Sequence, residues 1–196
     1  KVLAVDADPD ANLASALGIA PEAAEKALPL AEQSDLIEER TGSRPGAPGG
    51  MFSINPKVDD VPDAYSIQHE GVRLLVMGTV KKGGAGCVCG ENTLIKSLVR
   101  HLLVERKDVV IMDMVAGVEH LGRGTAAAVD ALLVVVEPGQ RSLETARTVQ
   151  RLAADLKIQR VYAVGCKVRS DKDRELIGQA LPGMTVLGYL PYSPAA

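Results

Sequence analysis

Short apolar runs alternate along the chain with amphipathic stretches, and this alternation constrains the fold more than any other feature. Six runs are apolar at nearly every position, which is typical of strands buried on both faces of a parallel sheet. They span residues 2–5, 72–77, 109–112, 131–136, 161–164 and 185–187. Residues 91–104 and 142–156 instead repeat leucine and valine at helical spacing, as crossover helices do. The pattern predicts an α/β fold with a doubly wound, mostly parallel sheet and helices on both faces.

Composition limits the class of protein. The chain has 196 residues, 46% of them hydrophobic, so we expect one globular domain over residues 1–196. Its 22 basic and 25 acidic residues leave a net charge of −3, which favours neither nucleic acid nor an anionic membrane as a partner. We find no apolar stretch of about 20 residues and no signal peptide, so we expect a cytoplasmic protein.

Residues 41–65 interrupt the alternation. Glycine and proline cluster there, and we predict a long irregular insertion whose surface contacts a partner.

The residues that follow each run matter, because ligands bind beyond the carboxyl ends of the strands in an open parallel sheet. Asp8 follows the first run, Asp113 the third and Glu137 the fourth. Carboxylates gathered on one edge require a cation, which favours Mg²⁺ with a phosphate ligand. Asp113 follows apolar residues in the pattern by which nucleotide hydrolases hold Mg²⁺. An aspartate after a strand can equally form a turn, and Asp10 or Asn12 can cap the next helix.

A phosphate-binding loop of the form G-x-x-x-x-G-K-[ST] is absent from the sequence. The nearest approximation is the glycine-rich segment 81–87, where Cys87 and the Val88 that follows it stand in the places of the required Lys and Thr. We therefore reject this segment as a phosphate loop.

Cys87 ends that glycine-rich segment, and Cys89 follows it after one intervening residue. Alternate residues of an extended segment point the same way, so both sulfurs can face one metal ion. A disulfide between them would be strained, whereas two thiolates are half of a tetrahedral or square-planar site. The third cysteine, Cys166, ends an apolar run, and we expect it to be a buried structural thiol. A second copy of the chain is the simplest source of the missing thiolates, which predicts a metal on the twofold axis of a homodimer. The alternative is that both cysteines are ordinary small residues.

Five motifs together resemble the nickel-insertion ATPases that mature carbon monoxide dehydrogenase, and the match spans nearly the whole chain. The motifs are residues 6–13, 51–59, 77–89, 112–124 and 137–146. These ATPases belong to the MinD/ParA-like class of P-loop NTPases, which dimerise around nucleotide. The resemblance implies ATP and ADP as ligands, Mg²⁺ as cofactor and carbon monoxide dehydrogenase as the client.

The resemblance also implies residue roles. Asp8 matches the aspartate that orients the attacking water, Asp113 the aspartate that reaches Mg²⁺, and Gly117 the position that senses the γ-phosphate. Cys87 and Cys89 match the pair that binds nickel, or zinc in its absence, at the dimer interface.

Some positions depart from the family. The phosphate loop and its strand would precede Val2, so we expect the chain to begin after them, to end before its last helix and, alone, to hydrolyse ATP negligibly. Lys167 and Pro191 match residues near the adenine, although Cys166 stands where relatives have an asparagine. Gly90 replaces an expected proline.

Two other functions remain open. The first is a metal-binding dimer that uses the same thiolates without nucleotide. The second is a reductase of the nitrogenase iron-protein type, whose cysteines come singly from two separate loops, unlike Cys87 and Cys89.

Overall fold

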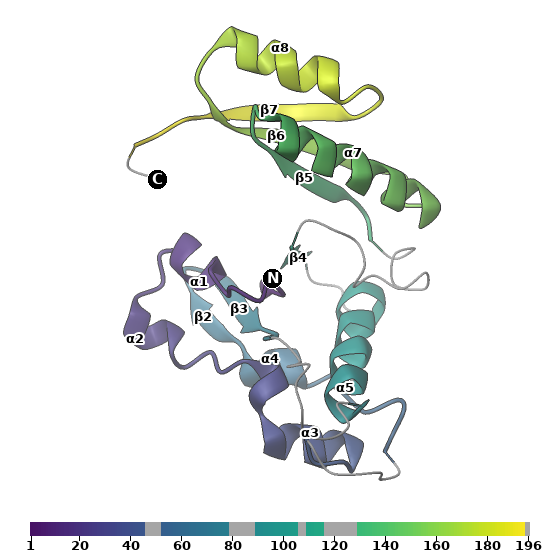
Figure 1. Cartoon of the computed structure of the whole chain (residues 1–196). Helices are drawn as coiled ribbons and strands as arrows, with labels where there is room; N and C mark the ends of the chain where they lie inside the picture. The colour runs from purple at the N-terminus through teal and green to yellow at the C-terminus, as the bar shows by residue number, and fades with distance from the viewer. Residues whose placement is uncertain (46–51, 79–88, 106–108, 116–128, 195–196) are drawn as a thin grey trace. The chain divides into compact units, whose positions relative to one another are not determined.

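The computed structural model describes residues 1–45, 52–78, 89–105, 109–115 and 129–194. Contacts within the chain divide it into two compact units, Lys1–Val115 and Ala116–Ala196. Each unit holds a sheet and its own helices (Figure 1). The expectation of a single domain stays a prediction.

The first unit is built on a four-stranded sheet with the order β2-β3-β1-β4. Strands β1 (Val2–Asp6), β3 (Val72–Val76) and β4 (Val109–Asp113) run parallel, with β1 between the other two. They confirm three of the predicted strands. The unpredicted edge strand β2 (Ile67–His69) pairs antiparallel with β3. The hairpin between them turns at Glu70 and Gly71, both of which have positive φ.

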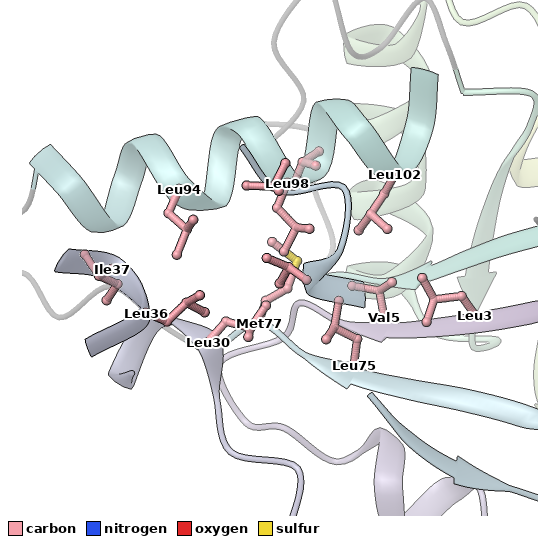
Figure 2. Packing of buried hydrophobic residues seen from close by; sticks show 13 residues of the cluster. Leu3, Val5, Leu30, Leu36, Ile37, Leu75, Met77, Leu94, Leu98 and Leu102 are labelled. Atoms are coloured by element: carbon pink, nitrogen blue, oxygen red, sulfur yellow. The ribbon is translucent and has the colours of Figure 1, made fainter. Parts of the chain in front are cut away.

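Helices cover both faces of this sheet. On one face, α1 (Leu13–Ala16), α2 (Pro21–Ala24) and their connections pack on Ala4, Leu74 and Val76. On the other, the short 3₁₀ turn η1 (Leu30–Glu32), α3 (Ser34–Thr41) and α5 (Cys89–Arg100) pack on the alternate strand residues. Figure 2 shows Leu94 and Leu98 of α5, and Leu102 just after it, pointing into this cluster, with Leu94 toward Leu36 and Ile37 of α3 and Leu102 toward Val5 and Leu3 of β1. The predicted helix over residues 91–104 is α5 and the π-helical turn His101–Glu105 that continues it.

The second half of the predicted insertion folds back on α3. Arg40 donates two hydrogen bonds to the carboxylate of Asp60, at 3.0 and 2.8 Å. Val58, together with Val61 from α4 (Val61–Tyr65), is buried in the same cluster as α3. Contact of this segment with a partner stays a prediction.

The second unit holds a parallel sheet with the order β5-β6-β7. Its strands are β5 (Leu132–Val136), β6 (Val161–Val168) and β7 (Thr185–Pro191), all of them predicted. Helices α7 (Gln140–Asp155) and α8 (Asp171–Ala180) pack against one apolar cluster that includes Val136 and Ala163. The structure thus has the predicted α/β fold with mostly parallel sheets.

Two strands differ from the expectation of burial on both faces. Leu3 and Val5 of β1 are fully buried, as predicted. On β4, however, Ile111 is 57% exposed, and on β5 Leu133 is 57% and Val135 64% exposed. No described element packs on these side chains closely enough to bury them. Within the described residues, no helix is both long and apolar enough to cross a membrane.

Candidate functional site

The carboxyl ends of β1 and β4 bring the predicted acidic residues of the first unit together. Asp6 ends β1 and Asp113 ends β4, and the two are Cα partners in the parallel ladder. The backbone N–H of Ala7 donates to the carbonyl oxygen of Asp113 at 2.9 Å. Asp8 follows directly, so two predicted site residues, Asp8 and Asp113, share one edge of the sheet.

The surroundings of Asp113 raise the pKa of its carboxyl group. Partial burial is the largest cause, and the negative charges of Asp6 and Asp8 add to it, against a hydrogen bond from the Met114 N–H. Both effects are relieved when a cation binds. Carboxylate oxygens are the ligands that Mg²⁺ prefers, and this ion commonly takes one or two carboxylates together with phosphate oxygens and water, so Asp113 can supply one ligand of such a site.

Asp6 was not among the predicted site residues, yet it organises this edge. Its side chain is fully buried, and its Oδ2 accepts the backbone N–H of Leu13 at 3.0 Å. Of the two residues that could cap α1, Asn12 occupies the N-cap position, but its side chain makes no cap hydrogen bond. The N–H of Asp10 donates to Asp8 Oδ1 at 2.8 Å. The sequence signal that could have identified Asp6 was an acidic residue at the last position of an apolar strand.

In the second unit, Lys167 lies at the corresponding end of β6. Its Nζ forms an ion pair with Glu137 Oε1 at 2.6 Å, just after β5. The hydrogen bond to Glu137 and then the charge of Glu137 raise the pKa of Lys167. The ladder shifts register between Gly165 and Val168, and Lys167 has a φ of +55°. Such a backbone conformation is uncommon outside glycine and is concentrated at functional sites.

Pro191 ends β7 beside a depression of about 280 Å³. The guanidinium group of Arg169 lies 4.0 Å from the centroid of the Tyr192 ring. The lining residues are Val168, Arg169, Ser170, Asp171, Arg174, Tyr189 and Pro191. Planar guanidinium and aromatic groups at one strand end suit stacking against a flat ring. Cys166 is half-buried nearby, and burial raises the pKa of its thiol.

The cysteine segment is the stretch from Gly78 to Gly90, and its two ends contact η1, α3 and the residues beside them. The N–H of Ala31 donates to the Met77 carbonyl at 2.9 Å. A Cβ on Gly78 would lie 2.6 Å from Pro29 Cβ. At the other end, a Cβ on Gly90 would lie 3.1 Å from Thr41 Oγ1. A side chain at position 90 would therefore require Thr41 to move by a few tenths of an ångström.

The predicted cysteines cannot be compared with a described geometry. Cys87 and Gly117 lie outside the described residues, and Cys89 begins α5 with its side chain also outside them. Among the side chains that the structure describes, no group of three His, Cys, Asp or Glu could hold a metal ion. Metal binding by Cys87 and Cys89 therefore stays a prediction.

Curated proteins similar to this chain match it over nearly all of its length. The carbon monoxide dehydrogenase accessory protein CooC of Rhodospirillum rubrum is 45% identical over 195 residues, which cover 100% of this chain and 74% of CooC. An uncharacterized ATP-binding protein of Methanocaldococcus jannaschii is 46% identical over 195 residues, covering 98% and 74% of the two chains. No protein-family model matches the chain.

Solved structures share the fold. The MinC:MinD cell division complex of Aquifex aeolicus aligns with a TM-score of 0.59 at 17% identity, covering 99% of this chain and 70% of that one. A plasmid partition protein of Borrelia burgdorferi aligns with a TM-score of 0.60 at 12% identity, covering 100% and 79%. At these identities the likeness shows the fold, which is that of MinD and plasmid partition proteins.

Proposed function

Because this chain belongs to the family of the carbon monoxide dehydrogenase accessory protein CooC, we propose that it is an ATP-dependent metallochaperone that delivers nickel to carbon monoxide dehydrogenase in the cytoplasm. The observation that carries the proposal is the 45% identity with CooC over the whole chain. The ATP-binding relative of Methanocaldococcus jannaschii supports the nucleotide half of the function.

ATP hydrolysis takes place at the carboxyl edge of the first sheet. Asp8 orients the water that attacks the γ-phosphate, and Asp113 holds Mg²⁺ through a water molecule. When bound, Mg²⁺ neutralises negative charge on the phosphate oxygens. Gly117 senses the γ-phosphate. The shared edge of Asp8 and Asp113, and the raised pKa of Asp113, support this assignment because a cation offsets the carboxylate repulsion.

The nucleotide base is held in the second unit by Lys167 and Pro191. Two features support this role: the unusual backbone of Lys167 and the depression beside Pro191. Glu137 restrains the lysine through the 2.6 Å ion pair, so its side chain is held at the end of β6.

Nickel is the cargo, bound by Cys87 and Cys89 from each of two copies of the chain. ATP favours the closed dimer in which the four thiolates meet, and loss of the γ-phosphate favours the open state. Hydrolysis thereby releases the metal to the client enzyme. The support is the cysteine spacing, since two thiolates separated by one residue form half of a four-sulfur site.

The decisive experiment measures metal content and subunit mass together on anaerobically purified protein. We expect about one nickel or zinc ion per dimer, shared across the twofold axis. Cys87→Ser and Cys89→Ser should each remove the metal and shift the protein toward monomer. Cys166→Ser is the matched control, because that thiol lies at the end of β6, and it should leave both unchanged.

Other outcomes identify the alternatives. Iron together with sulfide would indicate a reductase of the nitrogenase iron-protein type. A metal-bound dimer that neither binds nor responds to ATP in the intact protein would indicate a nucleotide-independent metal carrier. A metal-free monomer that neither cysteine variant alters would contradict the proposal.

A further inference from the structure

Asp6 ends β1 with its carboxylate withdrawn from solvent and hydrogen-bonded on both oxygens. The side chain has 0% exposure. Its Oδ1 accepts the N–H of Asp8 at 3.2 Å, and its Oδ2 accepts the N–H of Leu13 at 3.0 Å. A buried carboxylate is tolerated when its oxygens are paired in this way. The two bonds therefore close residues 7–12 into a loop fastened near both of its ends.

The enclosed loop has a defined shape. Asp8 accepts twice from within it, through Oδ1 from the Asp10 N–H at 2.8 Å and through its carbonyl from the Ala11 N–H at 3.1 Å. Ala11 has a φ of +48°, a left-handed conformation that costs free energy for alanine. Persistence of that conformation requires restraints from outside, and the Asp6 carboxylate supplies the bond at Leu13.

The backbone of Asp6 is itself fixed from both sides. Its carbonyl accepts the N–H of Met77 at 2.8 Å, beyond the end of β3. On the other side it pairs with Asp113 of β4, whose carbonyl accepts the Ala7 N–H. The carboxylate thus joins a central, rigid strand to the loop that carries Asp8.

We propose that Asp6 is a positioning residue, whose buried carboxylate holds the 7–12 loop so that Asp8 stays beside Asp113 for hydrolysis. The structural half of the inference, that Asp6 holds the 7–12 loop, rests on the hydrogen bonds alone. The catalytic half, that the held loop aligns Asp8 for hydrolysis, rests on the proposed ATP hydrolysis. Asp6 is buried and both of its carboxylate oxygens accept backbone N–H groups, so it affects the reaction only by positioning Asp8.

The test compares Asp6→Asn with Asp10→Asn in the intact protein. Asparagine keeps the shape of the side chain but has one acceptor oxygen, so one of the two N–H groups loses its partner. Asp10 is an exposed carboxylate in the same loop and serves as the matched control. Amide hydrogen exchange at Asp8 and Leu13 reports the loop without any need for ATP, and kcat and KM for ATP with Mg²⁺ report the reaction.

For Asp6→Asn we expect the exchange of at least one of these amides to become about tenfold faster or more, because a buried N–H loses its acceptor. We expect kcat to fall about tenfold or more while KM changes less than about threefold, because the residue aligns a group needed in the transition state. Asp10→Asn should change neither readout appreciably.

Three results would overturn the proposal. Unchanged exchange in Asp6→Asn would show that the carboxylate does not hold the loop. Faster exchange with unchanged kcat would leave Asp6 a structural residue without a positioning role. Rapid exchange of Leu13 in the wild-type protein would overturn it even where the variant does not fold. Absence of ATP turnover by the wild-type protein would instead refute the proposed hydrolysis and, with it, the catalytic half, while exchange would still decide the structural half.

Discussion

At the scale of single residues, Asp113 stands in an environment that opposes its own charge. Partial burial and the charges of Asp6 and Asp8 raise its pKa, which means that the ionised residue destabilises the folded protein in the absence of a cation. Residues at functional sites commonly accept such a penalty because the ligand later removes it. The penalty is therefore measurable in the protein without nucleotide or Mg²⁺.

Asp113→Asn is expected to stabilise the ligand-free protein at neutral pH. Because the pKa of Asp113 is raised on folding, protonated Asp113 stabilises the folded state relative to the ionised residue, and this stabilisation is lost as pH rises through the folded pKa. Asparagine carries no charge, so the variant avoids that loss at neutral pH. The gain should be under about 1 kcal/mol for this partly exposed group and should vanish near about pH 3. Urea denaturation at both pH values measures it. Asp35→Asn, an exposed aspartate in the first turn of α3, should give no gain. A loss of stability at neutral pH in Asp113→Asn would contradict this account.

Lys167→Ala tests the base-binding role of the second unit. We expect ADP affinity to fall by about tenfold, the effect of losing one charged contact. Lys157→Ala is the matched control, because Lys157 is also exposed and also has positive φ, at +61° against +55° for Lys167. Both variants thus carry a similar backbone cost. Isothermal titration with ADP distinguishes them, and equal losses would argue against a nucleotide contact at Lys167.

At the scale of elements, the apolar runs predicted all six parallel strands because burial in a sheet selects apolar residues locally. The sequence was less informative where the cause was nonlocal. Helix α8 was missed although Ser170 and Asp173 form its capping box, a short signal without a strong apolar run. The loop that holds Asp8 depends on Asp6, which is remote from Leu13 in sequence, so local capping rules favoured Asn12 instead.

The exposed faces of β4 and β5 show the same limit. Alternation and apolar content indicate which residues can be buried, whereas the elements that pack on them decide which are. Val135 and Ile111 satisfy the pattern of a buried strand and remain exposed by 64% and 57%. The cysteine pair could be predicted only from spacing and resemblance.

Gly78→Ala tests how the cysteine segment is anchored. Gly78 has a φ of +71°, and a Cβ there would lie 2.6 Å from Pro29 Cβ. Gly42 has a similar φ of +74° with open space around it, so Gly42→Ala isolates the backbone cost of about 1 kcal/mol. We expect Gly78→Ala to lose about 1–3 kcal/mol more, from overpacking against Pro29. Thermal or urea unfolding measures the difference. Equal losses would mean that Gly78 is free to move away from Pro29.

At the scale of the whole molecule, the described residues form separate apolar cores in the two units. Leu98 of α5 and Ile177 of α8 are fully buried, one in each unit. Ile111 and Leu133, also one in each, are strand residues that are 57% exposed. Leucine and isoleucine side chains therefore occur both buried and exposed in each unit, and substituting them tests where burial stabilises the fold.

Alanine substitution at these four positions should separate core from surface. Leu98→Ala and Ile177→Ala are each expected to lower the free energy of unfolding by about 2–5 kcal/mol, since they lose burial and leave a cavity. Ile111→Ala and Leu133→Ala should each lose under about 1 kcal/mol, the range of strand propensity. Hydrogen exchange resolved along the chain assigns each loss to residues 1–115 or 116–196. If Ile111→Ala or Leu133→Ala lowered the free energy of unfolding as much as the core variants do, these strand faces would be covered in the protein in solution. An exposed side chain has little buried surface to lose.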